Sequence, residues 1–206
     1  MTSPNFTFES QALASGHNFI CGIDEAGRGP WAGPVVASAV ILDRKNIPQG
    51  LNDSKKLNEA KREALFDPIM QSSHVGIGIV SAAEIDDINI LQATFVAMQR
   101  AFDQLDVKSD LALIDGNKSP KLSCKTQTII GGDAKSLSIA AASIIAKVTR
   151  DRIMHQLDLI YPQFNFARHK GYGTAAHAAA LSKIGPCAEH RKSFKPIALI
   201  LDQSDL

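Results

Sequence analysis

Residues 17–42 read HNFICGIDEAGRGPWAGPVVASAVIL, and this stretch decides the fold. Apolar and β-branched residues dominate its two ends, from His17 to Ile23 and from Pro34 to Leu42, which is typical of buried strands. Between these runs lies Gly27-Arg28-Gly29-Pro30, a turn-forming segment in which glycine lets the backbone approach a ligand closely. We therefore predict two strands joined by a glycine-rich loop.

Further strands and a long helix follow along the chain. Runs of the same apolar kind predict strands at Val75 to Val80, Leu111 to Ile114 and Thr126 to Ile130. Ser81 and Glu84 have the spacing of a capping box, in which both side chains satisfy free N–H groups at a helix start. The helix that they begin carries apolar residues at three- and four-residue steps on one face: Ile88, Leu91, Phe95, Met98, Phe102 and Leu105.

Three other helical segments are predicted. One covers Asn58 to Phe66, and Pro68 should end or kink it because proline lacks an N–H donor. Another runs from about Ala134 to Ile160, with a small apolar stripe suited to packing on a sheet. From Thr174 onward the chain is alanine-rich and predicts one or two short helices, with Gly185 at a C-terminal cap.

The order of these elements predicts an α/β fold. Three early strands joined by short connections, then strands alternating with helices, indicate a five-stranded mixed sheet flanked by helices. A chain of 206 residues, 45% of them hydrophobic, is in the range for one domain. We expect one domain over 1–206, with a sheet-and-helix core at 17–160 and a small helical region at 161–206. The weakly patterned segment from Pro196 to Leu206 is expected to be frayed or disordered.

Composition argues against membrane and exported classes. The first twenty residues lack the basic start and apolar core of a signal peptide, and no stretch reaches the 18 or so apolar residues of a membrane span. Cys21, Cys124 and Cys187 are odd in number and far apart, so neither a disulfide framework nor a thiolate zinc site is indicated. We predict a cytoplasmic protein that has no membrane contact.

The net charge of +1 hides an uneven distribution. The segment from Lys147 to Lys195 contains nine Lys and Arg residues and three Asp and Glu residues. The segment from Glu84 to Asp110 contains six acidic and two basic residues. One interpretation is a basic face toward a polyanion such as nucleic acid. The other is solvated charge scattered over helix surfaces.

Four carboxylates stand at the ends of predicted elements. Asp24 and Glu25 follow the first apolar run, Asp115 ends the run before Gly116, and Asp133 follows two glycines and precedes a helix. Taken singly they suggest a strand-ending turn, an Asx turn and a helix N-cap. Together they fall where one sheet edge could gather them, and ligand sites in open α/β sheets lie at that edge.

Converging carboxylates require a cation. Two like charges at 4 Å repel by about 4 kcal/mol at an effective dielectric near 20. Oxygen ligands without nearby His or Cys suit Mg²⁺ or Mn²⁺, and so acidic a cluster could hold two ions about 3.5–4 Å apart. His155, His169, His177 and His190 are scattered with no close pair at metal-ligand spacing, and we assign no histidine a catalytic role.

Three further segments suggest contacts to a polyanion. The stretch from Asn52 to Leu57 places amide, hydroxyl and ammonium groups before a helix, as in phosphate contacts, or simply as a solvated helix start. Lys147, Arg150 and Arg152 lie on the helix predicted after Asp133. Tyr172 stands in a glycine-flanked basic loop, where its ring could stack on a nucleotide or pack against the protein.

The ordered set of these motifs resembles the bacterial ribonuclease HII family, over roughly Phe19 to Phe194. Each block alone is weakly specific, whereas the blocks in this order and spacing are highly specific. They are Gly22–Pro30, Asn52–Leu57, Ile114–Asn117, Gly132-Asp133, Ala140–Ile144, Ala146–Asp151 and His169–Tyr172.

The resemblance implies a ribonuclease H-like fold whose C-terminal helical region completes the substrate cleft. It also implies a nuclease that cuts the RNA strand of RNA–DNA hybrids and nicks duplex DNA 5′ of embedded ribonucleotides, using two Mg²⁺ or Mn²⁺ ions and leaving 3′-hydroxyl and 5′-phosphate ends. Removal of ribonucleotides and RNA primers is the implied role. The metal-binding catalytic residues would be Asp24, Glu25, Asp115 and Asp133, and the substrate-binding residues Gly27, Arg28, Gly29, Asn52, Ser54, Lys55, Lys147 and Tyr172.

Two alternatives stay open. Ribonuclease HIII shares the fold but has an additional N-terminal domain and usually Glu as the fourth acid, whereas here about sixteen residues precede the first strand and the fourth acid is Asp133. The second alternative is a module that binds RNA–DNA hybrids without cutting them. The expected partners are hybrid and ribonucleotide-containing duplexes; no obligate protein partner or clamp-binding tail is evident after Phe194, and we expect a monomer.

Overall fold

A computed structural model describes residues 3–204 and shows a five-stranded mixed sheet. The strand order is β3-β2-β1-β4-β5; β2 is antiparallel to both β1 and β3, whereas β4 is parallel to β1 and β5. The predicted fold class is therefore confirmed. The strands are β1 (Ile20–Ala26), β2 (Val35–Leu42), β3 (Ser73–Val80), β4 (Leu111–Asp115) and β5 (Lys125–Ile129).

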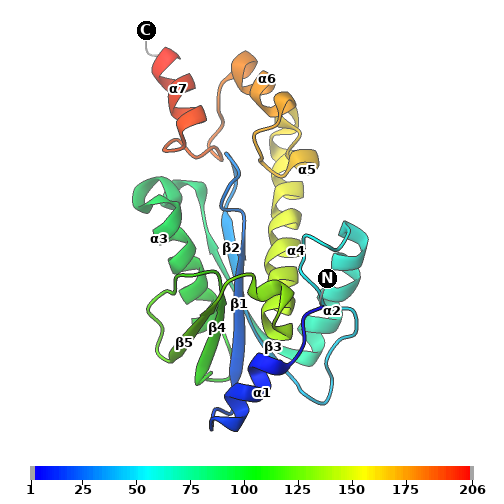
Figure 1. Ribbon diagram of the computed structural model, residues 1–206. Helices are drawn as coiled ribbons and strands as arrows, with labels where there is room; N and C mark the ends of the chain where they lie inside the picture. The colour runs from blue at the N-terminus through cyan, green and yellow to red at the C-terminus, as the bar shows by residue number, and fades with distance from the viewer. Residues whose placement is uncertain (1–2, 205–206) are drawn as a thin grey trace.

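Helices cover both faces of this sheet (Figure 1). Helix α3 packs on one face, while α4 packs on the other and carries α2 on its outer side. The C-terminal helices lie beyond the end of α4, at the end of the molecule opposite α1. The helices are α1 (Thr7–Ala14), α2 (Glu59–Ser72), α3 (Ala82–Asp103), α4 (Leu137–Ile160), α5 (Phe166–His169), α6 (Ala175–Ile184) and α7 (Lys195–Ser204), with 3₁₀ turns η1 (Gly132–Ala134) and η2 (Pro162–Phe164).

The central strand β1 is buried on both faces, and alternation of its side chains decides which helix each residue meets. Cys21 and Ile23 join the apolar cluster under α3. Gly22 points toward α4, where an added Cβ would lie 2.1 Å from the carbonyl carbon of Ser138. Helix α4 therefore rests directly on the backbone of β1, an approach that only glycine permits.

Two helix signals predicted from the sequence are present in the structure. The Ser81 hydroxyl accepts a hydrogen bond from the Glu84 N–H, and the Glu84 carboxylate accepts one from the Ser81 N–H, so the capping box is confirmed. Gly185 follows α6 with φ at 71°, as expected of a glycine C-cap.

Several predictions of element boundaries and connections were wrong. Helix α2 continues past Pro68 to Ser72, because Ile69 is fully buried in the core beneath α4 and packing outweighs the lost N–H. The connection between β2 and β3 is not short, since it spans 43–72 and contains α2. Helix α4 begins at Leu137 after the separate turn η1. Residues 195–204 form α7 rather than a frayed end, because Ile197 is buried against the other C-terminal helices; the last two residues lie outside the described part.

Within residues 3–204, no helix combines the length and apolar composition that crossing a membrane requires.

Candidate active site

The parallel pairing of β1 and β4 brings two of the four carboxylates together. Ile23 pairs with Ile114 in this register, so Asp24 and Asp115 occupy the next step on neighbouring strands. Strand β1 runs to Ala26, three residues beyond the end predicted at Ile23, so Asp24 lies inside the strand. Both aspartates point to the α4 face of the sheet, as residues one step beyond Ile23 and Ile114 must.

A glycine turn supplies the third carboxylate. Gly131 adopts the left-handed conformation, and the Gly132 N–H donates a hydrogen bond of 2.6 Å to Asp115 Oδ1. An added Cβ on Gly132 would lie 3.3 Å from that same oxygen and 2.6 Å from Ile139 Cδ1, so this side of the turn is closely packed. The turn aims Asp133 at the sheet edge. Asp133 is not the N-cap of α4, because Ser136 has that place and accepts a hydrogen bond from the Ile139 N–H.

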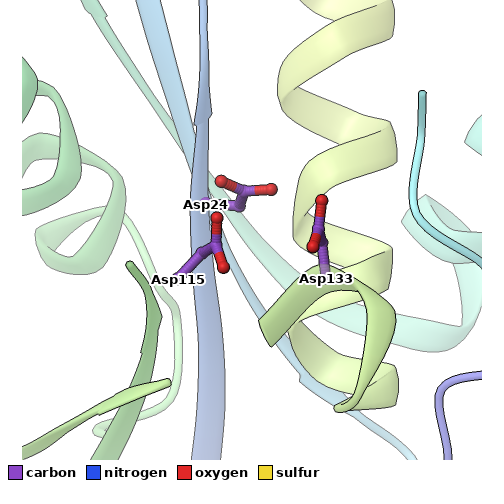
Figure 2. Close-up of side chains that lie close together, drawn as sticks. All are labelled: Asp24, Asp115 and Asp133. Carbon is purple, nitrogen blue, oxygen red and sulfur yellow. The ribbon is translucent and has the colours of Figure 1, made fainter. Parts of the chain in front are cut away.

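Asp24, Asp115 and Asp133 converge on one point, as Figure 2 shows. One carboxylate oxygen from each lies within 4.8 Å of the other two. Burial raises the pKa of Asp24 well above its usual range, and the Glu25 and Asp115 carboxylates raise it further. Burial also raises the pKa of Asp133, assisted by Asp115 and Asp53. Buried oxygens that repel one another in this way are the donor set of a hard divalent cation.

Glu25 does not join these three carboxylates. It follows Asp24 on β1 and so points to the opposite, α3 face of the sheet. It lines a groove of about 380 Å³ that runs from the α3 side chains Phe95 and Met98 to Asp115 at the end of β4. Burial raises the pKa of Glu25, while Arg28, 3.5 Å away, lowers it. The sequence predicted that four carboxylates would converge. In the structure three of them do, and Glu25 lies beside the cluster on the other face of β1.

Lys55 faces the carboxylate cluster from the loop before α2. Its Nζ lies 3.6 Å from Asp133 Oδ2, and its side chain is 80% exposed. Burial lowers the pKa of Lys55, but the carboxylates of Asp133 and Asp24 outweigh this and leave the pKa raised. The Asp53 carboxylate also raises the pKa of Asp133, and the sequence alone did not identify Asp53 as part of the site. Lys55 thus brings a cation to the edge of an anionic centre.

A second pocket opens beside the cluster. Its volume is about 220 Å³, and it is lined by residues 25–29, Lys55, Lys147, Arg150 and Tyr172. The Tyr172 ring is 47% exposed, and its Cε1 would lie 3.7 Å from a Cβ on Gly29. The structure therefore places the glycine loop and the tyrosine, 143 positions apart, on the two sides of one pocket.

Two of the predicted substrate contacts lie outside this pocket. Ser54 is buried, with its N–H donating to Ser143 Oγ and its carbonyl accepting from Arg62. Asn52 is half-buried, and its side-chain oxygen accepts a hydrogen bond from the Asp53 N–H. Both residues shape the loop that presents Lys55.

The basic segment from Lys147 to Lys195 is not simply a solvated face. Lys147 donates a hydrogen bond of 2.7 Å to Asp151, and burial lowers its pKa. Arg150 and Arg191 are fully buried, and their N–H groups contact backbone carbonyls of residues 27–34 and Lys170. The sequence singled out Arg150 among the bases of its helix but not Arg191, and it did not predict the burial of either, because arginines are usually solvent-exposed.

Three histidines that are distant in sequence meet behind the Tyr172 loop. His177 Nε2 lies 2.9 Å from His190 Nε2, and His177 Nδ1 lies 3.0 Å from the carbonyl oxygen of Tyr172. The Cys187 N–H donates to His190 Nδ1 over 3.0 Å. His169 stacks on His177 with the ring centres 4.4 Å apart. Burial lowers the pKa of His177, and burial together with His177 lowers the pKa of His190 to about 4.

Comparison with known proteins identifies a family. The sequence signature described as Ribonuclease HII matches residues 21–197. The chain belongs to the ribonuclease HII family. It is 52% identical over 199 residues to a ribonuclease HII of Parvibaculum lavamentivorans, covering 96% of this chain and 74% of that relative. It is 55% identical over 190 residues to a ribonuclease HII of Vibrio parahaemolyticus, covering 91% and 90%. A ribonuclease HII is an enzyme of the ribonuclease H class.

Solved structures of ribonucleases H share the fold of this ribonuclease HII chain. The ribonuclease H2 of Pyrococcus horikoshii superposes with a TM-score of 0.76 at 27% identity, covering 90% of this chain and 98% of that one. The ribonuclease HII of Archaeoglobus fulgidus, solved in complex with PCNA, gives 0.73 at 26% identity, covering 86% and 96%. The predicted ribonuclease H-like fold is thereby confirmed.

Proposed function

We propose that this chain hydrolyses the RNA strand of RNA–DNA hybrids and nicks duplex DNA on the 5′ side of an embedded ribonucleotide. The ends produced are a 3′-hydroxyl and a 5′-phosphate, and the role is removal of ribonucleotides and RNA primers. One observation carries the proposal: three converging carboxylates lie beside a pocket with a glycine loop on one side and Tyr172 on the other. Metal-dependent phosphodiester cleavage and selection for a sugar are the two properties that this activity needs.

The carboxylate cluster suits Mg²⁺ or Mn²⁺. Asp24, Asp115 and Asp133 offer oxygen atoms only, which hard cations prefer over the nitrogen and sulfur ligands of zinc sites. Glu25, which lines a groove with Asp115, is the residue that we propose as a ligand of a second ion. One or two bound ions would supply Lewis acidity toward the attacking water and the departing 3′-oxygen.

The protein's own groups position the substrate. Lys55 and Lys147 line the pocket and provide cations for phosphates on either side of the scissile bond. The backbone N–H groups of the glycine loop and the Tyr172 hydroxyl are candidates to bind the ribose 2′-hydroxyl. A site that hydrogen-bonds a hydroxyl rejects the analogue lacking it by about 10⁴ to 10⁵, because its polar groups are then left unpaired. Ordinary DNA would thus be spared.

The C-terminal helical region completes the cleft in this proposal. It contributes Tyr172 to the pocket and buries Arg191 under the glycine loop. The chain would act as a monomer in the cytoplasm, where its three unpaired cysteines stay reduced. Nucleic acid is its one proposed partner, and a clamp partner like the PCNA of the Archaeoglobus complex is not part of the proposal.

Cleavage of a labelled duplex that carries one ribonucleotide tests the proposed function. We expect a cut on the 5′ side of the ribonucleotide with Mg²⁺ or Mn²⁺, none after chelation, and none in the matched all-DNA duplex. A uniform RNA–DNA hybrid should also be cut. Binding without cleavage under either metal would instead indicate a hybrid-binding module, and a cut elsewhere would refute the assigned position.

Tyr172 variants test how the sugar is selected. Tyr172→Ala should weaken cutting at a single ribonucleotide far more than it weakens Mn²⁺ affinity or affinity for all-DNA duplex. Tyr172→Phe separates the role of the ring from that of the hydroxyl, because it keeps the ring over Gly29 and removes only the hydroxyl proposed to bind the ribose. Equal loss of duplex binding and of cleavage in Tyr172→Ala would mean that the ring serves packing alone.

A further inference from the structure

Two arginines are buried beneath the glycine loop without carboxylate partners. Arg150 on α4 is 1% exposed and Arg191 before α7 is 0% exposed. Within residues 3–204 neither forms an ion pair. Burial lowers the pKa of Arg150 to about 10, and burial together with Arg150 lowers that of Arg191 to about 9. Because burying a charge is costly, the contacts that these residues make require an explanation.

Backbone carbonyls take the place of carboxylates around Arg191. Its Nη2 donates to the Gly27 carbonyl over 2.6 Å, its Nη1 to the Arg28 carbonyl over 3.0 Å, and its Nε to the Gly33 carbonyl over 2.9 Å. Three donors of one guanidinium thus bind both ends of the loop that follows β1. The rigid fork of arginine is suited to this, whereas a lysine ammonium is not.

These contacts fix the direction in which the loop's N–H groups point. In a trans peptide the N–H lies opposite the carbonyl of the preceding residue. With the Gly27 and Arg28 carbonyls turned inward to Arg191, the N–H groups of Arg28 and Gly29 turn outward. Neither has a hydrogen-bond partner within residues 3–204, and both residues line the pocket. The loop therefore presents two unpaired donors to whatever occupies the pocket.

Arg150 joins this loop to the loop of Tyr172. It donates to the carbonyls of Pro34 and Ala32 in the first loop, at 2.9 and 3.2 Å, and to the Lys170 carbonyl in the second, at 3.0 Å. A Cβ on Gly27 would lie 2.0 Å from Arg150 Nε, so this glycine is needed for the guanidinium to lie against the loop. One side chain thus holds the two sides of the pocket at a fixed separation.

We propose that Arg150 and Arg191 are positioning residues for selection of the ribonucleotide. Arg191 keeps the N–H groups of Arg28 and Gly29 directed into the pocket, and Arg150 keeps that loop in register with Tyr172. This rests on the proposed function, since it concerns how the same pocket distinguishes ribose from deoxyribose. Arg150 also lines the pocket, but the guanidinium donors of both arginines are engaged with backbone carbonyls, so both act through the loops that they hold.

Conservative lysine variants test the proposal. Arg191→Lys and Arg150→Lys keep a positive charge but lack the planar fork that spans the three separated carbonyls, so a loop shift of about 1 Å should lower cutting at a single ribonucleotide roughly 100-fold. Mn²⁺ affinity and affinity for all-DNA duplex should stay within about twofold of the unaltered protein, since neither depends on the loop. Arg100→Lys is the matched control: Arg100 also binds a backbone carbonyl, that of Ile79, but lies on α3.

A double-mutant cycle separates positioning from general stability. If Arg150 acts through the Tyr172 loop, Arg150→Lys should add little further loss of cutting in a Tyr172→Ala background. Provided that the unaltered protein cuts at the ribonucleotide, either of two results would overturn the proposal. One is that the losses of cutting are fully additive, and the other is that a lysine variant keeps its selectivity. If the unaltered protein does not cut there, the proposed function itself fails.

Amide exchange in the unaltered protein gives a test that does not depend on variants folding. The Arg28 and Gly29 amides should exchange freely in the protein alone and become protected on binding a duplex with one ribose, in Ca²⁺ to prevent cleavage. The all-DNA duplex should protect them less. Protection already present in the free protein would show that these N–H groups do not point into the pocket, and would overturn the proposal.

Discussion

Replacing Gly22 by alanine should disturb the carboxylate cluster through the packing of α4 on β1. The added Cβ would lie 2.1 Å from the Ser138 carbonyl carbon and 2.3 Å from the Ile139 nitrogen. Ordinary contact begins at 3.4 Å, so the start of α4 must move away by about 1.3 Å. Because the opposing atoms are backbone, no side chain can rotate to relieve the overlap.

The displacement acts on one side of the cluster only. Asp24 stays with β1, two residues beyond Gly22, whereas Asp133 belongs to the turn that leads into α4 and moves with the helix. Ligand oxygens now within 4.8 Å would separate. We expect a loss of about 1–3 kcal/mol in the free energy of unfolding and a roughly 100-fold loss of cleavage rate, with weaker Mn²⁺ binding.

Calorimetric Mn²⁺ titration, urea unfolding and the single-ribonucleotide cleavage assay together measure these effects. Gly76→Ala is the matched control, because its Cβ would lie 2.0 Å from the Ala101 carbonyl oxygen, on the α3 side and away from the aspartates. The control should lose stability but keep its Mn²⁺ affinity. The reasoning is refuted if a folded Gly22→Ala protein binds Mn²⁺ and cuts within about twofold of normal, or if both variants lose metal affinity equally.

Three further predictions concern single side chains. Asp115→Asn keeps an oxygen for the Gly132 N–H, so the fold should persist with slightly higher metal-free stability, while activity falls by more than about 100-fold; near-normal turnover would make Asp115 a turn residue only. Lys147→Ala should reduce the slope of log affinity against log salt by about 0.9 for each phosphate that the lysine neutralises, measured by fluorescence anisotropy, and an unchanged slope would show that Lys147 binds no phosphate. The pKa of His190 is lowered to about 4, so its contribution to the free energy of unfolding is present above pH 6.5 and is lost as pH falls toward 4. The contribution amounts to about 3 kcal/mol. Urea unfolding of His190→Gln between pH 6.5 and 4 should lack this pH-dependent loss of stability.

The sheet and the acidic positions could be predicted because they rest on local patterns. Apolar runs bounded by turn residues identified all five strands, and Asp24, Asp115 and Asp133 stood at strand ends and a glycine turn. The face of the sheet to which Glu25 points could not be predicted, because the predicted strand ended at Ile23, before Glu25. With β1 extended to Ala26, alternation puts Asp24 and Glu25 on opposite faces.

Features decided by tertiary packing were missed. Proline predicts a helix end near Pro68, but burial of Ile69 carries α2 onward. The buried Arg150 and Arg191 left no pattern of their own in the sequence. A signal was nevertheless present, because the loop 27–34 contains two prolines and three glycines, and its buried carbonyls had to find donors outside a sheet or helix. The sequence does not tell which side chains provide those donors.

The imidazole chain behind Tyr172 has a direction, and this assigns a tautomer to each ring. The Tyr172 carbonyl can only accept, so His177 must carry its proton on Nδ1 and offer a lone pair at Nε2. His190 must then carry its proton on Nε2, which leaves Nδ1 to accept from the Cys187 amide. His177 is therefore the Nδ1–H tautomer and His190 the Nε2–H tautomer. The ¹⁵N chemical shifts of the two rings, measured by NMR, distinguish these tautomers directly. A proton added to either ring would set two donors against each other, so the Tyr172 loop is supported by rings that work only while uncharged.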